Sequence, residues 1–169
     1  HGTHIAGTIA AVNNNGIGVC GIAGGDGTPN SGVKIMSAQI FSGRNSNNAT
    51  QSVIAKAFKY AADNGAVIAN NSWGSPANTS QNDSWYKTYN SIEYEAINNY
   101  FIDKAKPPNL DSGVVIFAAG NEGYQQSVYP GAFNEFISVT SIGIDGKKAS
   151  YSNYGPGCNI AAPGGNSSR

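Results

Sequence analysis

The sequence predicts an α/β protein with a mostly parallel sheet, flanked by helices in three layers. Short apolar runs alternate with longer segments of helical periodicity, in the order strand, helix, strand, helix, strand. One run, Val114–Ala119, is continuously apolar, as a strand covered on both faces must be. Because ligands gather at the carboxyl ends of parallel strands, functional residues are expected in the loops that follow these runs.

Length and composition favour one domain over residues 1–169, since 169 residues can bury a real core but are too few for two ordinary domains. Charged residues make up 12% and the formal net charge is zero, which argues against nucleic acid or an anionic membrane as partner. The abundant Asn and Gly residues predict a surface of amides and hydroxyls, typical of a secreted or cell-surface protein. No apolar run approaches the ~20 residues of a membrane span, and no signal peptide is visible.

The first element is predicted as a helix over His1–Ala11, with Ile5 and Ile9 on one apolar face. Gly2 and Gly7 each cost a helix interior roughly 1 kcal/mol relative to Ala, so we expect a central helix against which other backbone packs closely. His1 and His4 would share one face. They can be interpreted as a metal pair or as two ordinary hydrogen-bonded histidines, and no further ligands complete a metal shell.

The remaining elements follow from apolar periodicity and capping signals. Thr50 caps a predicted helix and Gly65 ends it. Asp83 or Ser84 begins a second long helix that ends before Pro107-Pro108. The predicted helices are 51–64 and 83–106, the strands are 33–41, 66–71, 114–119, 136–142 and 159–162, and the polar loops are 12–32, 42–48 and 76–82.

Two features between these elements leave alternatives open. Asn13–Val19 is an Asn/Gly loop whose oxygens could surround a hard cation such as calcium, although it also suits a turn of residues that tolerate left-handed backbone. Cys20 and Cys158 could form a disulfide, but sequence spacing does not establish their distance. We favour two buried free thiols.

Four blocks together resemble the subtilisin-like serine proteases, in the family's order and spacing along essentially the whole chain. They are His1–Gly7, Asn71–Gly74, Ala118–Gly123, and Tyr151–Pro156 leading to Ala162–Gly164. The resemblance implies that His1 is the catalytic base and that Asn121 donates its side-chain N–H to the oxyanion. Both roles agree with the chemistry, because a serine hydroxyl needs a base and the developing oxyanion needs a fixed donor.

The resemblance also assigns a substrate cleft. Ser72, Trp73 and Gly74 match the strand that pairs with extended peptide, and Gly120 and Glu122 lie beside the pocket for the residue preceding the scissile bond. Glu122 would then favour basic or polar side chains. Tyr129–Pro130 matches a family position with a cis peptide bond, so a cis bond is expected here.

No cofactor is implied for catalysis, and calcium is implied only weakly. The loop resembles the family's calcium loop, with Asn14, Ile17 and Val19 at ligand positions. However, it is one residue longer, and part of the family site lies upstream of residue 1.

The family's Asp, His, Ser triad is incomplete in this sequence. The Asp would precede His1 and the Ser block would follow Arg169, and Ser152, Ser167 and Ser168 lack the flanking residues of the nucleophile. We therefore expect a piece of a catalytic domain, truncated at both ends and inactive alone. The alternative is a non-catalytic peptide-binding domain whose parent has also lost the triad.

The same comparison predicts a gap in the sheet. In the family, the strand that bears the Asp lies between the strands corresponding to 33–41 and 66–71. Unpaired strand edges are costly, so we expect a rearranged sheet or a homodimer in which each copy fills the other's gap.

Overall fold

A computed structural model of the chain describes residues 1–41, 49–75 and 81–166. The predicted loop at 42–48, most of the loop at 76–82, and Ser167 and Ser168 lie outside these residues. The chain forms two compact units, His1–Ala38 and Gln39–Arg169, and each is described by itself. That the chain is one domain stays a prediction.

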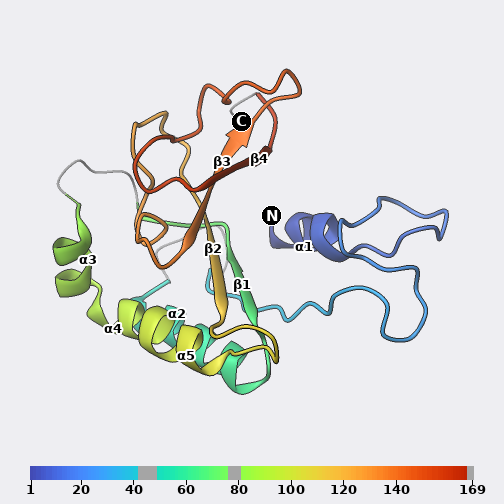
Figure 1. Ribbon diagram of the computed structural model, residues 1–169, viewed down its shortest axis with the longest axis horizontal. Helices are drawn as coiled ribbons and strands as arrows, with labels where there is room; N and C mark the ends of the chain where they lie inside the picture. Colours follow the sequence, from blue (N-terminus) through green and yellow to red (C-terminus); the bar gives the residue numbers. More distant parts are fainter. Residues whose placement is uncertain (42–48, 76–80, 167–169) are drawn as a thin grey trace. The chain divides into compact units, whose positions relative to one another are not determined.

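Unit 1 contains one helix and a set of loops (Figure 1). Helix α1 spans Gly2–Ala10, with His1 as its N-cap residue. The loop after it returns to the end of the helix, where the N–H groups of Ile22 and Ala23 donate to the carbonyls of Thr8 and Ile9 at 2.9 and 2.8 Å. These main-chain bonds join the helix and the loop into one body.

The prediction that α1 is closely surrounded is wrong within unit 1. No α1 residue is buried, and a Cβ at Gly2 or Gly7 would meet nothing within 4 Å. The close backbone approach lies at the other end of the helix, where a Cβ on Gly21 or Gly24 would collide with main-chain atoms of Ala11. Two loop glycines, and not the helix glycines, therefore allow the tight packing.

The predicted strand at 33–41 is also wrong, since the structure has no strand there. Val33 donates its N–H to Ala23 at 2.9 Å, and the side chains of residues 33–39 are exposed. A strand is stable only when a neighbour satisfies its backbone groups. In the part of the chain that the structure describes, this segment has no such ladder, so its apolar alternation does not produce a strand.

Unit 2 is built on a parallel four-stranded sheet in the order β1-β2-β3-β4 (Figure 1). The strands are β1 at Ile68–Asn71, β2 at Val114–Ala118, β3 at Ile137–Ile142 and β4 at Ile160–Pro163. Val115 and Phe117 are buried on β2, the central strand of highest apolar content. The predicted α/β class, with a parallel sheet and flanking helices, is confirmed.

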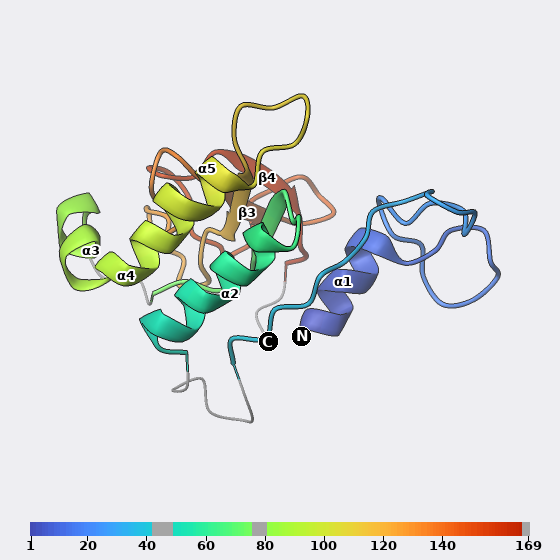
Figure 2. The same cartoon turned by 90° about the horizontal axis from the view of Figure 1, so that it is seen from below.

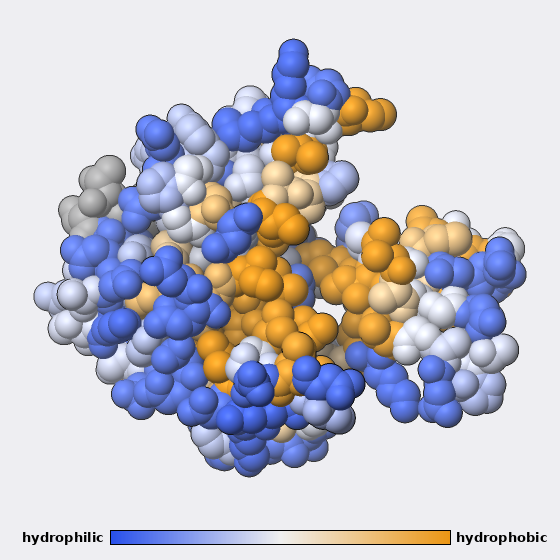
Figure 3. Space-filling model, in the orientation of Figure 1, coloured by the Kyte–Doolittle hydropathy of each residue, from blue (hydrophilic) through white to orange (hydrophobic). Residues whose placement is uncertain are grey.

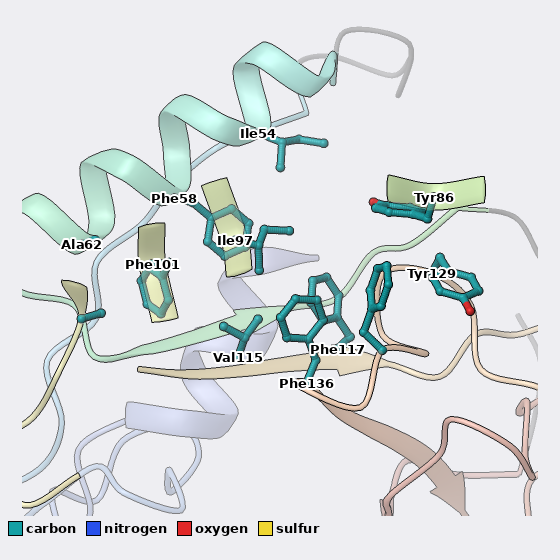
Figure 4. Close-up of a cluster of buried hydrophobic side chains, with 12 residues drawn as sticks. Ile54, Phe58, Ala62, Tyr86, Ile97, Phe101, Val115, Phe117, Tyr129 and Phe136 are labelled. Atoms are coloured by element: carbon teal, nitrogen blue, oxygen red, sulfur yellow. The ribbon is translucent and has the colours of Figure 1, made fainter. Parts of the chain in front are cut away.

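Helix α2 spans Gln51–Asp63. Beside it lies the helical segment Ser91–Lys104, and the two together cover the sheet (Figure 2). The Thr50 hydroxyl accepts from the N–H of Val53, and Gly65 has a φ of +86° just after the helix, as the capping pattern predicts. Phe58 of α2 packs edge-on against Phe101, with ring centroids 5.6 Å apart, in the hydrophobic core (Figure 4).

The second predicted helix is interrupted. Its parts are α3 at Asp83–Tyr89, α4 at Ser91–Tyr94, the π-helical segment η2 at Glu95–Phe101 and α5 at Ile102–Lys104. The break falls at Asn90, whose φ of −125° and ψ of 36° are not helical. Asn favours such positions because its side chain competes with helical hydrogen bonds. Amphipathic spacing continues across the break, which explains why one long helix was expected.

Three other expectations have clear outcomes. The Tyr129–Pro130 peptide bond is cis, as predicted. Both cysteines are free, but the prediction that they are buried is wrong, since Cys20 is exposed in a surface loop and Cys158 is half-buried. None of the helices in the described ranges is long and apolar enough to cross a membrane.

A buried carboxyl bridges the helix break. The Tyr86 hydroxyl of α3 donates to Oε1 of Glu93 on α4, and only 4% of Glu93 is exposed. Burial raises the pKa of Glu93 to about 7, against a smaller lowering by the Tyr86 hydrogen bond. Between about pH 4.5 and pH 7, the folded state therefore holds a proton that the unfolded state has already released.

Stability is accordingly expected to fall as pH rises from about 4.5 to about 7, by roughly 3 kcal/mol for this group. Glu93→Gln keeps an oxygen for Tyr86 and removes the ionisation, so it should flatten this slope. Urea unfolding at pH 4.5, 5.5 and 7 measures the effect as the difference between the two proteins. Parallel slopes would contradict it.

Candidate active site

The loop Gly120–Tyr124 begins where β2 ends. The N–H of Ala119 donates to the carbonyl of Val139 at 3.0 Å, which extends the pairing with β3 by one residue. The chain then turns at Gly120, whose φ is +113°. A residue with a side chain is strained in this conformation, so a glycine is required at the junction between β2 and the loop.

Asn121 lies exposed on this loop. Its main-chain N–H donates to Glu122 Oε2 at 2.9 Å. Among the residues that the structure describes, the side-chain amide of Asn121 has no hydrogen-bond partner. The backbone of this residue is therefore held, while its amide remains available to donate to a ligand.

The Glu122 carboxylate turns back onto its own loop. Oε2 accepts from Asn121 N and from the Asn153 amide, at 2.9 and 3.1 Å. One oxygen of this carboxylate is thus committed to two donors within the protein. A preference of Glu122 for basic or polar substrate side chains stays a prediction.

Ser72, Trp73 and Gly74 follow the carboxyl end of β1. Ser72 is exposed, whereas the Trp73 ring packs edge-on against Phe117, with centroids 5.3 Å apart. The Trp73 ring therefore packs against the hydrophobic core. Gly74 is exposed but closely approached, because a Cβ there would collide with Val128.

Val128 joins the two predicted clusters. Its Cγ2 faces Gly74, and its Cγ1 would lie 2.8 Å from a Cβ on Gly120. The adjacent Tyr129 carbonyl accepts from the N–H of Ser75 at 2.7 Å. The structure thus brings Ser72–Gly74 and Gly120–Glu122 to one place. The sequence analysis did not identify Val128. Its only sequence signal is an apolar residue directly before the Tyr129–Pro130 pair.

His1 lies in unit 1, so the predicted base and the predicted oxyanion donor belong to different units. It is exposed at the N-terminus of α1 and makes no side-chain capping bond. Its main-chain carbonyl accepts from the N–H of Ile5 at 3.2 Å, which starts the helix. Unit 1 by itself therefore presents the His1 imidazole without a local partner among its described residues.

The predicted calcium loop has the left-handed backbone that its composition suggests, at Asn14, Gly16 and Gly18. Ile17 donates its N–H to Asn15 Oδ1 at 3.0 Å, and Asn13 Oδ1 is buried without a hydrogen-bond partner. No group of three or more His, Cys, Asp or Glu residues in the described ranges could hold a metal. The loop offers neutral oxygens only, which suit weak binding of a hard cation. Calcium at Asn14, Ile17 and Val19 stays a prediction.

The fold and the site define an α/β protein with a candidate ligand-binding edge at the carboxyl ends of β1 and β2. The family model described as "Subtilase family" matches residues 1–169. The chain belongs to the subtilase family of serine proteases.

Relatives share sequence along almost the whole chain. Subtilisin Savinase of Lederbergia lenta and thermitase of Thermoactinomyces vulgaris are each 34% identical over 97% of the chain. Among solved structures, a protease of Pseudoalteromonas arctica matches 98% of the chain with a TM-score of 0.72 and 30% identity. The chain spans 50%, 49% and 44% of these three proteins, about half of each.

The requirement for glycine at the junction between β2 and the loop can be tested with Gly120→Ala. Its Cβ would collide with the Asn153 amide and lie 2.8 Å from both Glu122 Oε2 and Val128 Cγ1. Gly146→Ala is the matched control, since Gly146 also has a positive φ, +72°, but has open space around it. We expect a loss of roughly 1 kcal/mol for the control and roughly 2–4 kcal/mol for Gly120→Ala, measured by urea unfolding. Equal losses would show that the loop gives way without cost.

Proposed function

We propose that this chain forms part of the catalytic domain of a serine endopeptidase. In this proposal His1 is the general base, Asn121 is the oxyanion donor, and the Asp and Ser of the triad come from residues outside residues 1–169. The observation that carries the proposal is Asn121 itself. Its backbone is anchored just after β2, while its side-chain amide has no hydrogen-bond partner among the described residues.

The proposed reaction follows from the chemistry of these groups. The neutral His1 imidazole takes the proton of the serine hydroxyl as the oxygen attacks the peptide carbonyl. Negative charge moves to the carbonyl oxygen, and the Asn121 amide donates to it. The intermediate then collapses as the imidazolium gives its proton to the leaving amine. Water hydrolyses the resulting acyl-enzyme by the same steps, which regenerates the serine hydroxyl.

The proposed substrate is an extended peptide or protein segment. The main chain of Ser72–Gly74 continues from β1 but forms no strand ladder among the described residues, so its backbone can pair with a peptide. Gly74 and Gly120 both lie against Val128, which brings the loop Gly120–Tyr124 close to this segment. Low charge, 12% of residues, supports a secreted or cell-surface location, where such substrates are met.

In the parent protein, Asn121→Ala should lower kcat with little change in KM, because the donor acts mainly on the transition state. The expected decrease in kcat is about 10²–10³-fold, the magnitude known for subtilisin of this same family. Asn121→Asp is matched in size and lacks the donor, so it should lower kcat by the same factor. Hydrolysis of a chromogenic peptide measures both. An unchanged kcat would remove Asn121 from the mechanism, and an inactive folded parent would favour a non-catalytic peptide-binding domain.

We also propose that the 169-residue chain associates through β1. Within the described part of unit 2, β1 pairs only with β2, and Ile68 on this edge strand is 58% exposed. Apolar side chains reach the surface elsewhere as well (Figure 3). An unpaired apolar edge can be satisfied by a strand from a second copy.

Sedimentation velocity should therefore show a dimer of the 169-residue chain. Ile68→Lys places a charge on the edge strand and should give a monomer. Ile144→Lys is the control, since Ile144 is fully exposed outside the strands and should leave the dimer intact. A monomeric wild-type chain would contradict the proposal.

A further inference from the structure

Asn153 is a completely buried side chain on which the loop Gly120–Tyr124 is assembled. Its exposed fraction is 0%, although it lies 31 residues from Glu122 in sequence. Oδ1 accepts from the N–H groups of Glu122 and Tyr124, both at 3.0 Å. Nδ2 donates to Glu122 Oε2 at 3.1 Å. The main-chain N–H of Asn153 donates to the Gly120 carbonyl at 3.1 Å. One residue therefore holds three positions of the loop.

The orientation of the Asn153 amide follows from its partners. Two N–H donors converge on one end, which must be the oxygen, and a carboxylate oxygen faces the other, which must be the nitrogen. Only a side chain with both an acceptor and a donor satisfies this arrangement. An Asp would set a second carboxylate against Glu122, and an apolar residue would leave the N–H groups of Glu122 and Tyr124 without their acceptor.

Asn153 is itself fixed to the sheet. Its carbonyl accepts from the hydroxyl of Thr140, on β3, at 3.2 Å. The neighbouring Ser152 hydroxyl accepts from the N–H of Ser141 at 2.9 Å. These bonds fix the segment that carries Asn153 to β3. The loop Gly120–Tyr124 is therefore anchored to the sheet through β3 as well as through β2.

The connection to Asn121 runs through Glu122. The same Oε2 that Asn153 holds accepts the main-chain N–H of Asn121 at 2.9 Å. Asn121 thus lies between the turn at Gly120 and a carboxylate fixed by Asn153. We propose that Asn153 is the positioning residue of the loop Gly120–Tyr124, here named the oxyanion loop, and that it aims the Asn121 amide by holding Gly120, Glu122 and Tyr124. This inference rests on the proposed function.

The catalytic role is tested by a double-mutant cycle of Asn121→Ala and Asn153→Ala in the parent protease. Asn153→Ala alone should lower kcat about 10- to 100-fold, since a displacement near 1 Å can cost about 100-fold. In the Asn121→Ala background it should lower kcat by less than about threefold, because the donor it positions is already gone. Equal losses in both backgrounds would overturn the proposal, since a general structural role is additive.

Asn159→Ala is the matched control. Asn159 Oδ1 also accepts a main-chain N–H, from Ser138 at 2.6 Å, but it does not touch the oxyanion loop. The control should lower stability without lowering kcat beyond about twofold. A similar kcat loss for Asn159→Ala and Asn153→Ala would also overturn the proposal.

A charge test addresses the contact with Glu122 directly. Asn153→Asp keeps the acceptor for both N–H groups but opposes Glu122, so kcat should fall about as far as with Asn153→Ala. Glu122→Gln can still accept both hydrogen bonds, and its own kcat is the reference against which the paired variant is compared. The pair Asn153→Asp with Glu122→Gln removes the repulsion and should recover kcat at least about fivefold over Asn153→Asp. No recovery would contradict the proposed path through Glu122.

Hydrogen exchange tests whether Asn153 anchors the loop Gly120–Tyr124, independently of whether the parent protein is a protease. In the 169-residue chain, Asn153→Ala should speed exchange of the Glu122 and Tyr124 amides at least about tenfold, and Asn159→Ala should not. If the wild-type parent is inactive, the proposed function and the catalytic role of Asn153 fail together, while exchange still reports the anchor. If the parent is active and these amides exchange at unchanged rates, the anchor itself is wrong.

Discussion

The parallel pairing of β2 with β1 and β3 is the constraint on which the site depends. Register places Asn71 beside Phe117 and Ala118 beside Val139, so the loops after β1 and β2 begin at the same edge of the sheet. Burial of Val115 and Phe117 holds β2 in that register, because a slip by one residue would turn both side chains to the opposite face. A packing requirement in the core thus decides where Ser72–Gly74 and Gly120–Glu122 meet.

Local signals predicted most of unit 2. The continuous apolar run gave β2, and the Thr50 cap with Gly65 gave α2 within a residue or two. Predictions that depend on contacts with other segments of the chain were less accurate. Apolar alternation at 33–41 predicted a strand, but a strand forms only with a neighbour, and neighbours are not encoded locally. Amphipathic spacing across 83–106 predicted one helix and could not show that Asn90 interrupts it.

The site shows the same division. Resemblance to subtilases indicated Asn121, Gly120 and Glu122 from the block that contains them, and the structure gives their backbone a physical reason in the turn at Gly120. The roles of Val128 and Asn153 rest on contacts between segments far apart in sequence, which no spacing predicts. Asn153 lies in the Tyr151–Pro156 block that resembles the family, but nothing in that block predicts that its side chain is buried against the loop Gly120–Tyr124.

In the proposed function, these residues belong to a serine protease whose nucleophile lies outside residues 1–169. The most direct measurement is labelling by a serine-directed fluorophosphonate, applied to the 169-residue chain beside the full-length parent. We expect the parent to be labelled and the 169-residue chain to remain unlabelled, since labelling needs an activated serine and a donor for the developing charge. A folded parent that takes no label would contradict the proposed serine protease function.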